Sequence, residues 1–134
     1  MRYLLDACAI LALFNGEEGS EALIDLFKKA RAGDITLSMS IVQLLEVYYD
    51  RVYVVGTEEA KKRVEAILAE PVHIIETISL PVLYEAGRFK TRYSMSLADS
   101  VAAATAKILS AALVTKDSEL EAAADGEFSI HWLK

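Results

Sequence analysis

The sequence contains a single cysteine, Cys8, and only two histidines, His73 and His131, among its 134 residues. One cysteine excludes an internal disulfide and a zinc cluster built on thiolates. The histidines lie far apart and lack the spacing of paired metal ligands, so neither is assigned a role. A chain with so few cysteines is expected in the cytoplasm, where disulfides are rare.

Long apolar runs are missing as well. No stretch reaches the roughly 18 uncharged apolar residues of a membrane span, and Asp6 comes too early for a signal peptide. Hydrophobic residues nevertheless make up 54% of the chain, which is rich for a small monomer. We therefore expect no membrane segment, and an apolar surface that is covered by self-association or by a partner.

Short apolar runs alternate with amphipathic segments along the whole chain, which predicts one α/β domain over residues 1–134. The expected strands are residues 3–5, 35–38, 73–76, 112–115 and 128–131. They are short and mostly apolar, as buried parallel strands are. The expected fold is a three-layer α/β/α structure with a mainly parallel central sheet.

Helix starts are marked by capping residues. Four serines stand at such starts, namely Ser20, Ser40, Ser79 and Ser96. Gln43 follows Ser40 by three residues, so this pair forms a capping-box pattern. The expected helices end near residues 31, 54, 70, 92, 109 and 126, and one more begins at Ala7.

Four acidic residues stand where an α/β fold places its reactive groups. Asp6 closes the first expected strand, and Asp117 follows the end of the fourth. Glu46 and Asp99 lie in early turns of two helices. Because the carboxyl ends of parallel strands and the starts of the following helices meet at one edge of a sheet, we expect the four carboxylates to converge.

Three of these acids also have a structural explanation. Asp6 could be the N-cap of a helix starting at Ala7, and Asp117 the N-cap of one starting at Ser118. Asp99 could complete a capping box with Ser96. The sequence alone leaves capping and function equally plausible for Asp6 and Asp117.

The surroundings of Asp99 and Glu46 favour function. Below Asp99 the helix presents a face of small residues, Ala102, Ala103 and Ala106, which lets it pack close to the sheet and turns the acid toward a cleft. Glu46 is too deep in its helix for a cap. Its stripe neighbours, Val42, Tyr49 and Tyr53, are expected to be at least partly buried, so Glu46 either reaches out to water at the rim or serves a site.

Converging carboxylates repel one another, since two unit charges about 4 Å apart cost roughly 4 kcal/mol at an effective dielectric near 20. A cation removes that cost, and a ligand set made of oxygen favours Mg²⁺ or Mn²⁺ over zinc. Such ions bind phosphate oxygens and activate water, which indicates phosphodiester hydrolysis. A divalent ion would cancel about half of the charge of four acids, so the net charge of −6 does not exclude a nucleic acid.

Thr115 stands two residues before Asp117 and could orient a carboxylate through its hydroxyl. Ordinary packing of a β-branched residue in a strand explains it equally well.

Four segments in this order and spacing resemble the PIN-domain ribonucleases, and in size the VapC toxins of prokaryotic toxin–antitoxin pairs. They are YLLD at 3–6, SIVQLLE at 40–46, SLAD at 96–99 and LVTKD at 113–117. The resemblance spans the whole chain. It implies the PIN-like fold and an endoribonuclease that cuts RNA with a metal-activated water.

The resemblance also implies a site and partners. Asp6 and Asp99 are the surest ligands of one or two Mg²⁺ or Mn²⁺ ions, while Glu46 and Asp117 bind directly or through water. A homodimer and a cognate antitoxin protein are the implied partners. Cys8 departs from the family, which often has Ser, Thr or Asn there, and a thiol is a poorer hydrogen-bond partner for Asp6.

A basic cluster of Arg88, Lys90 and Arg92, with Tyr93 beside it, lies just before the helix of Asp99. These residues could bind RNA phosphates while Tyr93 stacks on a base. A solvated helix end, favoured by the helix dipole, explains them equally well.

Three other functions compete with a ribonuclease. The main alternative is a non-catalytic PIN-like domain that binds a protein or a nucleic acid, against which the four intact acids argue. A phosphate-receiving signalling domain needs an adjacent acidic pair after its first strand, where this chain has Asp6 followed by Ala7. A phosphatase with an aspartyl nucleophile needs a second Asp at the position of Cys8.

Overall fold

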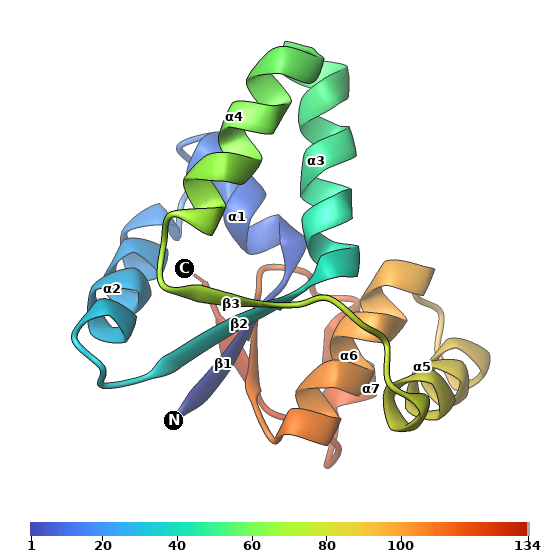
Figure 1. The fold of residues 1–134 in the computed structure, drawn as a ribbon. Coiled ribbons are helices and arrows are strands. Elements are labelled where there is room, and N and C mark those ends of the chain that lie inside the picture. Colours follow the sequence, from blue (N-terminus) through green and yellow to red (C-terminus); the bar gives the residue numbers. More distant parts are fainter. Residues whose placement is uncertain (134) are drawn as a thin grey trace.

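A parallel five-stranded sheet forms the centre of the molecule in the computed structural model, which describes residues 1–133 (Figure 1). Its strands are β1 (Arg2–Leu5), β2 (Thr36–Ser40), β3 (Val72–Ile75), β4 (Ala112–Thr115) and β5 (Ile130–Trp132). They lie in the order β3-β2-β1-β4-β5, and every neighbouring pair is parallel. The predicted parallel α/β fold is confirmed, with most strand ends within one or two residues of those expected.

Seven helices accompany the sheet in the described part of the chain. They are α1 (Ala7–Phe14), α2 (Ser20–Arg31), α3 (Ile41–Val55), α4 (Thr57–Leu68), α5 (Leu80–Arg92), α6 (Leu97–Leu109) and α7 (Leu120–Ala124). Ser40, Ser79 and Ser96 cap α3, α5 and α6 as predicted, each accepting a hydrogen bond from a backbone N–H of the first turn.

Two of the predicted helix starts were wrong. Gly19, with a φ of 100°, occupies the cap position of α2, and Ser20 is the first residue of the helix. The hydroxyl of Ser20 donates to the carbonyl of Glu17, so it closes a turn. The last helix begins at Leu120 and not at Ser118, because Asp117 forms a turn of its own before it.

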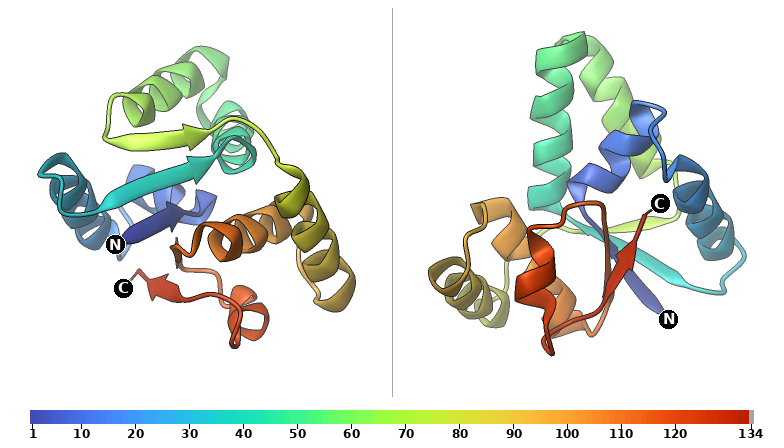
Figure 2. Two further views of the ribbon diagram at one scale, coloured as in Figure 1. Left: turned by 60° about the horizontal axis from the view of Figure 1, so that its bottom comes forward. Right: turned by 180° about the vertical axis from the view of Figure 1, so that it is seen from behind.

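The helices cover both faces of the sheet (Figures 1 and 2). Successive strand residues point to opposite faces. Leu4 and Leu113 pack with α5, α6 and α7, and Leu5 and Val114 pack with α1 to α4. All four are fully buried. This gives the three layers that were predicted.

The alanine-rich side of α6 brings this helix close to the strands. Ala102, Ala103 and Ala106 are fully buried, and α6 contacts β1, β2 and β4. Small side chains leave room for a close approach, which fixes where the N-terminal end of α6 lies relative to the strand ends. None of the helices within residues 1–133 has the length and apolarity that crossing a bilayer requires.

The order in which the chain adds strands to the sheet changes direction at the boundary between β1 and β4. It builds β1, β2 and β3 toward one edge, then returns to add β4 and β5 on the other side of β1. Such a switch point leaves a crevice at the carboxyl ends of the two central strands, which is where open α/β sheets bind ligands. Asp6 and the segment of Asp117 leave the sheet at this place.

Candidate metal centre

Asp6 is a buried carboxylate at the end of β1, with 2% of its surface exposed. Its Oδ1 accepts a hydrogen bond from the N–H of Ala7 at 2.9 Å. Its Oδ2 accepts from the hydroxyl of Thr115 at 2.8 Å and from the thiol of Cys8 at 3.2 Å. Burial raises the pKa of Asp6 in spite of these three donors. Asp6 therefore caps α1 and also belongs to the acidic site.

Thr115 connects the two strand ends. Its hydroxyl donates to Asp6 and accepts from the N–H of Asp117 at 2.9 Å. Because Thr115 is fully buried, water does not compete for these bonds. The Asp117 carboxylate in turn accepts from the N–H of Glu119 at 2.9 Å, so it closes a turn and is not the cap of a helix.

Asp99 lies in the first turn of α6 with 8% of its surface exposed. Its N–H donates to the hydroxyl of Ser96 at 3.0 Å. Burial first, and then the negative charges of Asp6, Asp117 and Glu46, raises the pKa of Asp99 to about 7. Asp99 thus experiences the negative charges of three other acids that leave the same edge of the sheet.

Glu46 is half-buried on α3 and reaches the same cluster. Its pKa is raised by burial and by the charges of Asp6, Asp117 and Asp50. The expected burial of its stripe was wrong at two positions, because Tyr49 is 48% and Tyr53 87% exposed. This face of α3 opens to water beyond Glu46, which places Glu46 at the rim of the site.

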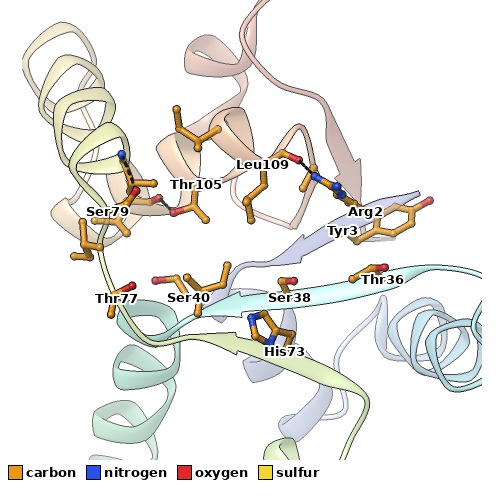
Figure 3. Close-up of a pocket in the computed structure, with 16 residues that line it drawn as sticks. Arg2, Tyr3, Thr36, Ser38, Ser40, His73, Thr77, Ser79, Thr105 and Leu109 are labelled. Atoms are coloured by element: carbon orange, nitrogen blue, oxygen red, sulfur yellow. Dashed lines mark hydrogen bonds between the residues drawn. The ribbon is translucent and has the colours of Figure 1, made fainter.

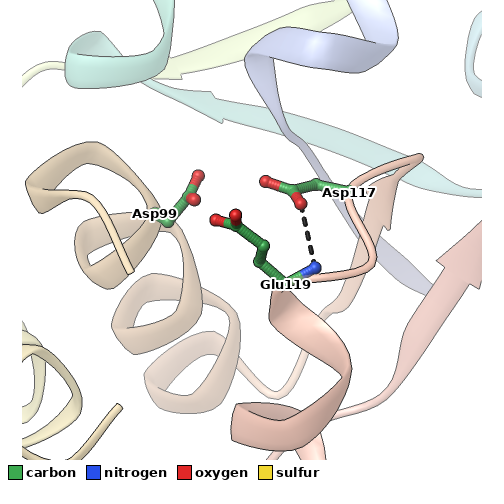
Figure 4. Close-up of side chains that lie close together, drawn as sticks. All are labelled: Asp99, Asp117 and Glu119. Atoms are coloured by element: carbon green, nitrogen blue, oxygen red, sulfur yellow. Dashed lines mark hydrogen bonds between the residues drawn. The ribbon is translucent and has the colours of Figure 1, made fainter. Parts of the chain in front are cut away.

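Glu119 is a further member that the sequence reasoning missed. One carboxylate oxygen of each of Asp99, Asp117 and Glu119 lies within 4.8 Å of those of the other two, and Figure 4 shows the three side chains pointing toward one another. The signal in the sequence was an acid two residues beyond Asp117, where the chain has just left the sheet. The helix predicted to start at Ser118 begins only at Leu120, and Glu119 lies in the turn that precedes it.

No cation of the described chain neutralises this cluster. None of the salt bridges within residues 1–133 involves Asp6, Glu46, Asp99 or Asp117. Lys116 is adjacent to Asp117 in sequence, but its ammonium group lies 3.4 Å from Glu17 and donates to a nearby backbone carbonyl. The acids therefore need a positive charge from elsewhere to be ionised together.

The ligand set fits a hard divalent ion. Every candidate donor in the cluster is a carboxylate oxygen, which Mg²⁺ and Mn²⁺ prefer. The Cys8 thiol adjoins Asp6, but burial and the Asp6 charge raise its pKa to about 12. Cys8 is thus a protonated hydrogen-bond donor at neutral pH and not a thiolate ligand.

Arg88, predicted to contact substrate, lies in a network of ion pairs. Its guanidinium contacts Glu85 at 2.7 Å and Glu127 at 2.6 Å, and Lys107 pairs with the same two acids. These bonds connect α5 and α6 to the segment before β5. Its charge is already matched, which leaves Arg88 poorly placed to bind a phosphate.

The other three residues of that cluster lie at the end of α5. Lys90 and Arg92 are exposed. Tyr93 is half-buried, with its ring 6.0 Å from that of Phe89. Two exposed cations and a half-buried aromatic ring thus lie a few residues before Asp99.

A separate cleft crosses the face of the sheet beside α5 and α6 (Figure 3). Its polar lining includes Thr36, Ser38, Ser40, His73, Thr77, Ser79 and Thr105. Several of these hydroxyls already serve the fold, since Ser40 and Ser79 cap helices and Thr105 donates to the carbonyl of Val101. None of the clustered acids lines this cleft, so it is distinct from the acidic site.

The same architecture occurs in solved structures of low sequence identity. A chain of the VapBC2 complex from Rickettsia felis, bound to a DNA fragment from its promoter, is 18% identical with a TM-score of 0.80, and 100% of each chain is covered. A chain of the DNA-bound VapBC from Salmonella typhimurium is 16% identical with a TM-score of 0.77, covering 100% of this chain and 99% of that one. A VapC toxin of Mycobacterium tuberculosis, described as cleaving the sarcin–ricin loop, is 15% identical with a TM-score of 0.67, covering 96% and 98%.

No curated protein matched the sequence. The family model described as the PIN domain matches residues 3–126, which include all five clustered acids. On the strength of this match over most of its length, the chain belongs to the PIN domain family.

Proposed function

We propose that this protein is a metal-dependent endoribonuclease that hydrolyses RNA phosphodiester bonds, and that it acts as the toxin of a toxin–antitoxin pair. The observation that carries the proposal is the cluster of acids at the switch point of the sheet. No cation of the described chain pairs with these acids. Membership of the PIN domain family supports nuclease activity, and the low-identity structural neighbours named as VapC toxins suggest the biological role.

In this proposal Asp6 and Asp99 hold Mg²⁺ or Mn²⁺. Glu46 and Asp117 bind the ion directly or through water, and Glu119 adds a carboxylate on the solvent-exposed side of the site. The bound ion supplies positive charge that stabilises the phosphodiester transition state and makes a water molecule more acidic.

In this proposal the chain's own side chains orient the metal ligands and contact the substrate. Thr115 and Cys8 donate to one oxygen of Asp6, which leaves a defined direction for its remaining lone pairs. Lys90 and Arg92 are available for RNA phosphates and Tyr93 for a base. Arg88 would first have to leave its ion pairs with acids.

The proposed partners are a cognate antitoxin and a second copy of the chain. Their support on this molecule is an uncovered stripe of large apolar residues along α3, formed by Ile41, Leu45, Tyr49 and Tyr53. These residues are 37% to 87% exposed, and a stripe of this kind marks an interaction surface. The proposed location is the cytoplasm, where RNA and antitoxin are present.

The decisive experiment measures cleavage of RNA by the purified protein with Mg²⁺ or Mn²⁺, with excess EDTA, and after the substitution Asp99→Asn. We expect cleavage only with metal and only with Asp99 intact. Asp25→Asn is the matched control, because Asp25 is an exposed acid of α2 outside the cluster. Undiminished cleavage in EDTA, or in Asp99→Asn, would refute the metal mechanism.

The same assay distinguishes a nuclease from the alternative function. A protein that binds RNA or a protein partner with its acids intact, yet never cleaves under any metal condition, is a non-catalytic interaction domain. Toxicity on expression that disappears with Asp99→Asn, and not with Asp25→Asn, supports the toxin role.

A further inference from the structure

Gln43 is a fully buried amide that connects two helices of the acidic site. The sequence pattern predicted that it would fold back onto Ser40 in a capping box. Its Nε2 donates instead to the carbonyl of Ala98 on α6, at 2.7 Å. Ser40 is left with the other half of the pattern, accepting from the N–H of Val42 at 3.1 Å.

The bond from Gln43 fixes one end of the peptide group that precedes Asp99. That peptide consists of the Ala98 carbonyl and the Asp99 N–H. The carbonyl accepts from Gln43, and the N–H donates to the hydroxyl of Ser96 at 3.0 Å. The peptide group ahead of Asp99 lies within α6 and is bonded by a side chain at each end, so Gln43 adds a restraint from α3 on the place where Asp99 leaves the backbone.

Gln43 also relates Asp99 to a second acid. It lies on α3 three residues before Glu46, which puts the two on neighbouring turns of one helix. The anchor on Ala98 therefore connects the helix that carries Glu46 with the helix that carries Asp99. Ser96, in contrast, belongs to the start of α6 itself and cannot set the distance between the helices.

We propose that Gln43 is a positioning residue for the acidic site, holding the Asp99 carboxylate in place relative to Glu46. It acts through the Ala98–Asp99 peptide and does not touch substrate. The inference rests on the proposed function, because it assigns Gln43 a part in the metal binding of that site.

The cost of keeping Gln43 buried supports this role. Its exposure is 0%, and its Oε1 is buried without a hydrogen-bond donor among the described residues. A buried acceptor left unpaired destabilises a fold, whereas an apolar side chain of similar shape would not. Methionine would also lose the bond to Ala98, but one hydrogen bond contributes less to stability than an unpaired buried acceptor costs. Stability alone thus favours methionine here, while the bond to Ala98 requires an amide donor.

The test compares Gln43→Met with wild type in three measurements. These are the affinity for Mn²⁺ by electron paramagnetic resonance, kcat and KM for RNA cleavage, and Tm without metal. We expect Mn²⁺ affinity and kcat to fall at least about tenfold, as for other groups that orient metal ligands. KM should stay the same, and Tm should equal or exceed that of wild type. Gln43→Leu is prepared in parallel in case the methionine variant does not fold.

Thr105→Val is the matched control, since Thr105 is a buried hydroxyl of α6 that bonds only to the carbonyl of Val101 in its own helix. It should leave Mn²⁺ affinity unchanged. An equal loss in Thr105→Val, or unchanged Mn²⁺ affinity and kcat in a folded Gln43 variant, overturns the proposal.

Absence of metal-dependent cleavage by wild type would instead count against the proposed function, while the Mn²⁺ affinities would still decide the role of Gln43.

Discussion

Replacing Asp99 by asparagine should stabilise the metal-free protein above neutral pH while removing its response to metal. In the folded chain the pKa of Asp99 is raised from 3.8 to about 7, chiefly by burial and then by the charges of Asp6, Asp117 and Glu46. Well below pH 3.8 the carboxyl is protonated in both the folded and the unfolded chain, so it does not affect the free energy of unfolding. As pH rises toward 7, the unfolded chain loses the proton more readily, and the folded state loses stability.

The size of this effect follows from the shift. The difference between about 7 and 3.8 is roughly 3 units, which at about 1.4 kcal/mol per unit gives about 4 kcal/mol for an isolated site above pH 7. Residual solvent screening and the sharing of repulsion among several acids reduce this figure. Asparagine also forgoes an attraction to the N-terminal helix dipole of about 0.3–1 kcal/mol. We expect a net gain of about 2 kcal/mol at pH 8, or roughly 5–10 °C in Tm for a chain of this size.

The assay is thermal unfolding at pH 8 and at pH 4, in EDTA and in excess Mg²⁺. In EDTA at pH 8 Asp99→Asn should unfold at a higher temperature than wild type, and most of the difference should be lost at pH 4. Mg²⁺ at 100 times its dissociation constant should stabilise wild type by about 2.7 kcal/mol and leave the variant almost unchanged. Asp25→Asn, an exposed acid on α2, should change none of these values. If Asp99→Asn is less stable than wild type in EDTA at pH 8, the electrostatic reasoning fails.

Three further substitutions test the surroundings of the site. Thr115→Val keeps the shape but removes the donor to Asp6 and the acceptor for the N–H of Asp117, so Mn²⁺ affinity should fall 10–100-fold by calorimetric titration. Unchanged affinity would mean that Thr115 only packs in the strand and does not support metal binding. Glu119→Gln should weaken Mn²⁺ binding and leave the wild-type Tm in EDTA unchanged or raised, because it removes one negative charge from an exposed position; a lower Tm would mean that Glu119 is structural. Cys8→Ser should retain activity or raise it up to a few-fold in the RNA cleavage assay, because a hydroxyl donates to Asp6 more strongly than a thiol, and a large loss would contradict this account.

The fold could be predicted from the sequence because its signals are local. A buried parallel strand is a short apolar run, and the caps at Ser40, Ser79 and Ser96 precede amphipathic helices as expected. The parallel arrangement then placed four acids at one edge of the sheet without any knowledge of their contacts. The sequence could not decide whether Asp6 is a helix cap or a member of the acidic site. In the structure it is both, because its Oδ1 accepts from the first N–H of α1 and its Oδ2 accepts from Thr115.

The errors concern contacts between distant segments. Gln43 has the spacing of a capping box, and only the packing of α3 against α6 offers its amide the carbonyl of Ala98 instead. Arg88 belongs to a basic run, but Glu127, 39 positions later, takes its charge. Glu119 was not predicted to belong to the site because the turn at Asp117 redirects the chain before α7 begins. For Gln43 and Arg88 the competing partner lies outside any window of local sequence, whereas for Glu119 the decisive turn is local and was not recognised.

The distribution of the acids over the fold explains how the chain keeps so many of them together. Asp6 and Asp117 belong to central strand ends tied by Thr115, whereas Asp99 and Glu46 are brought in by α6 and α3. The strand pair is rigid because its bonds are buried, and the helices are held by packing and by Gln43. The repulsion that raises the pKa of Asp99 therefore acts mainly across the junction between helices and strands. A cation bound there removes this repulsion, so metal binding should rigidify the starts of α3 and α6 more than the sheet, and amide hydrogen exchange with and without Mg²⁺ should show the added protection at those two helix starts first.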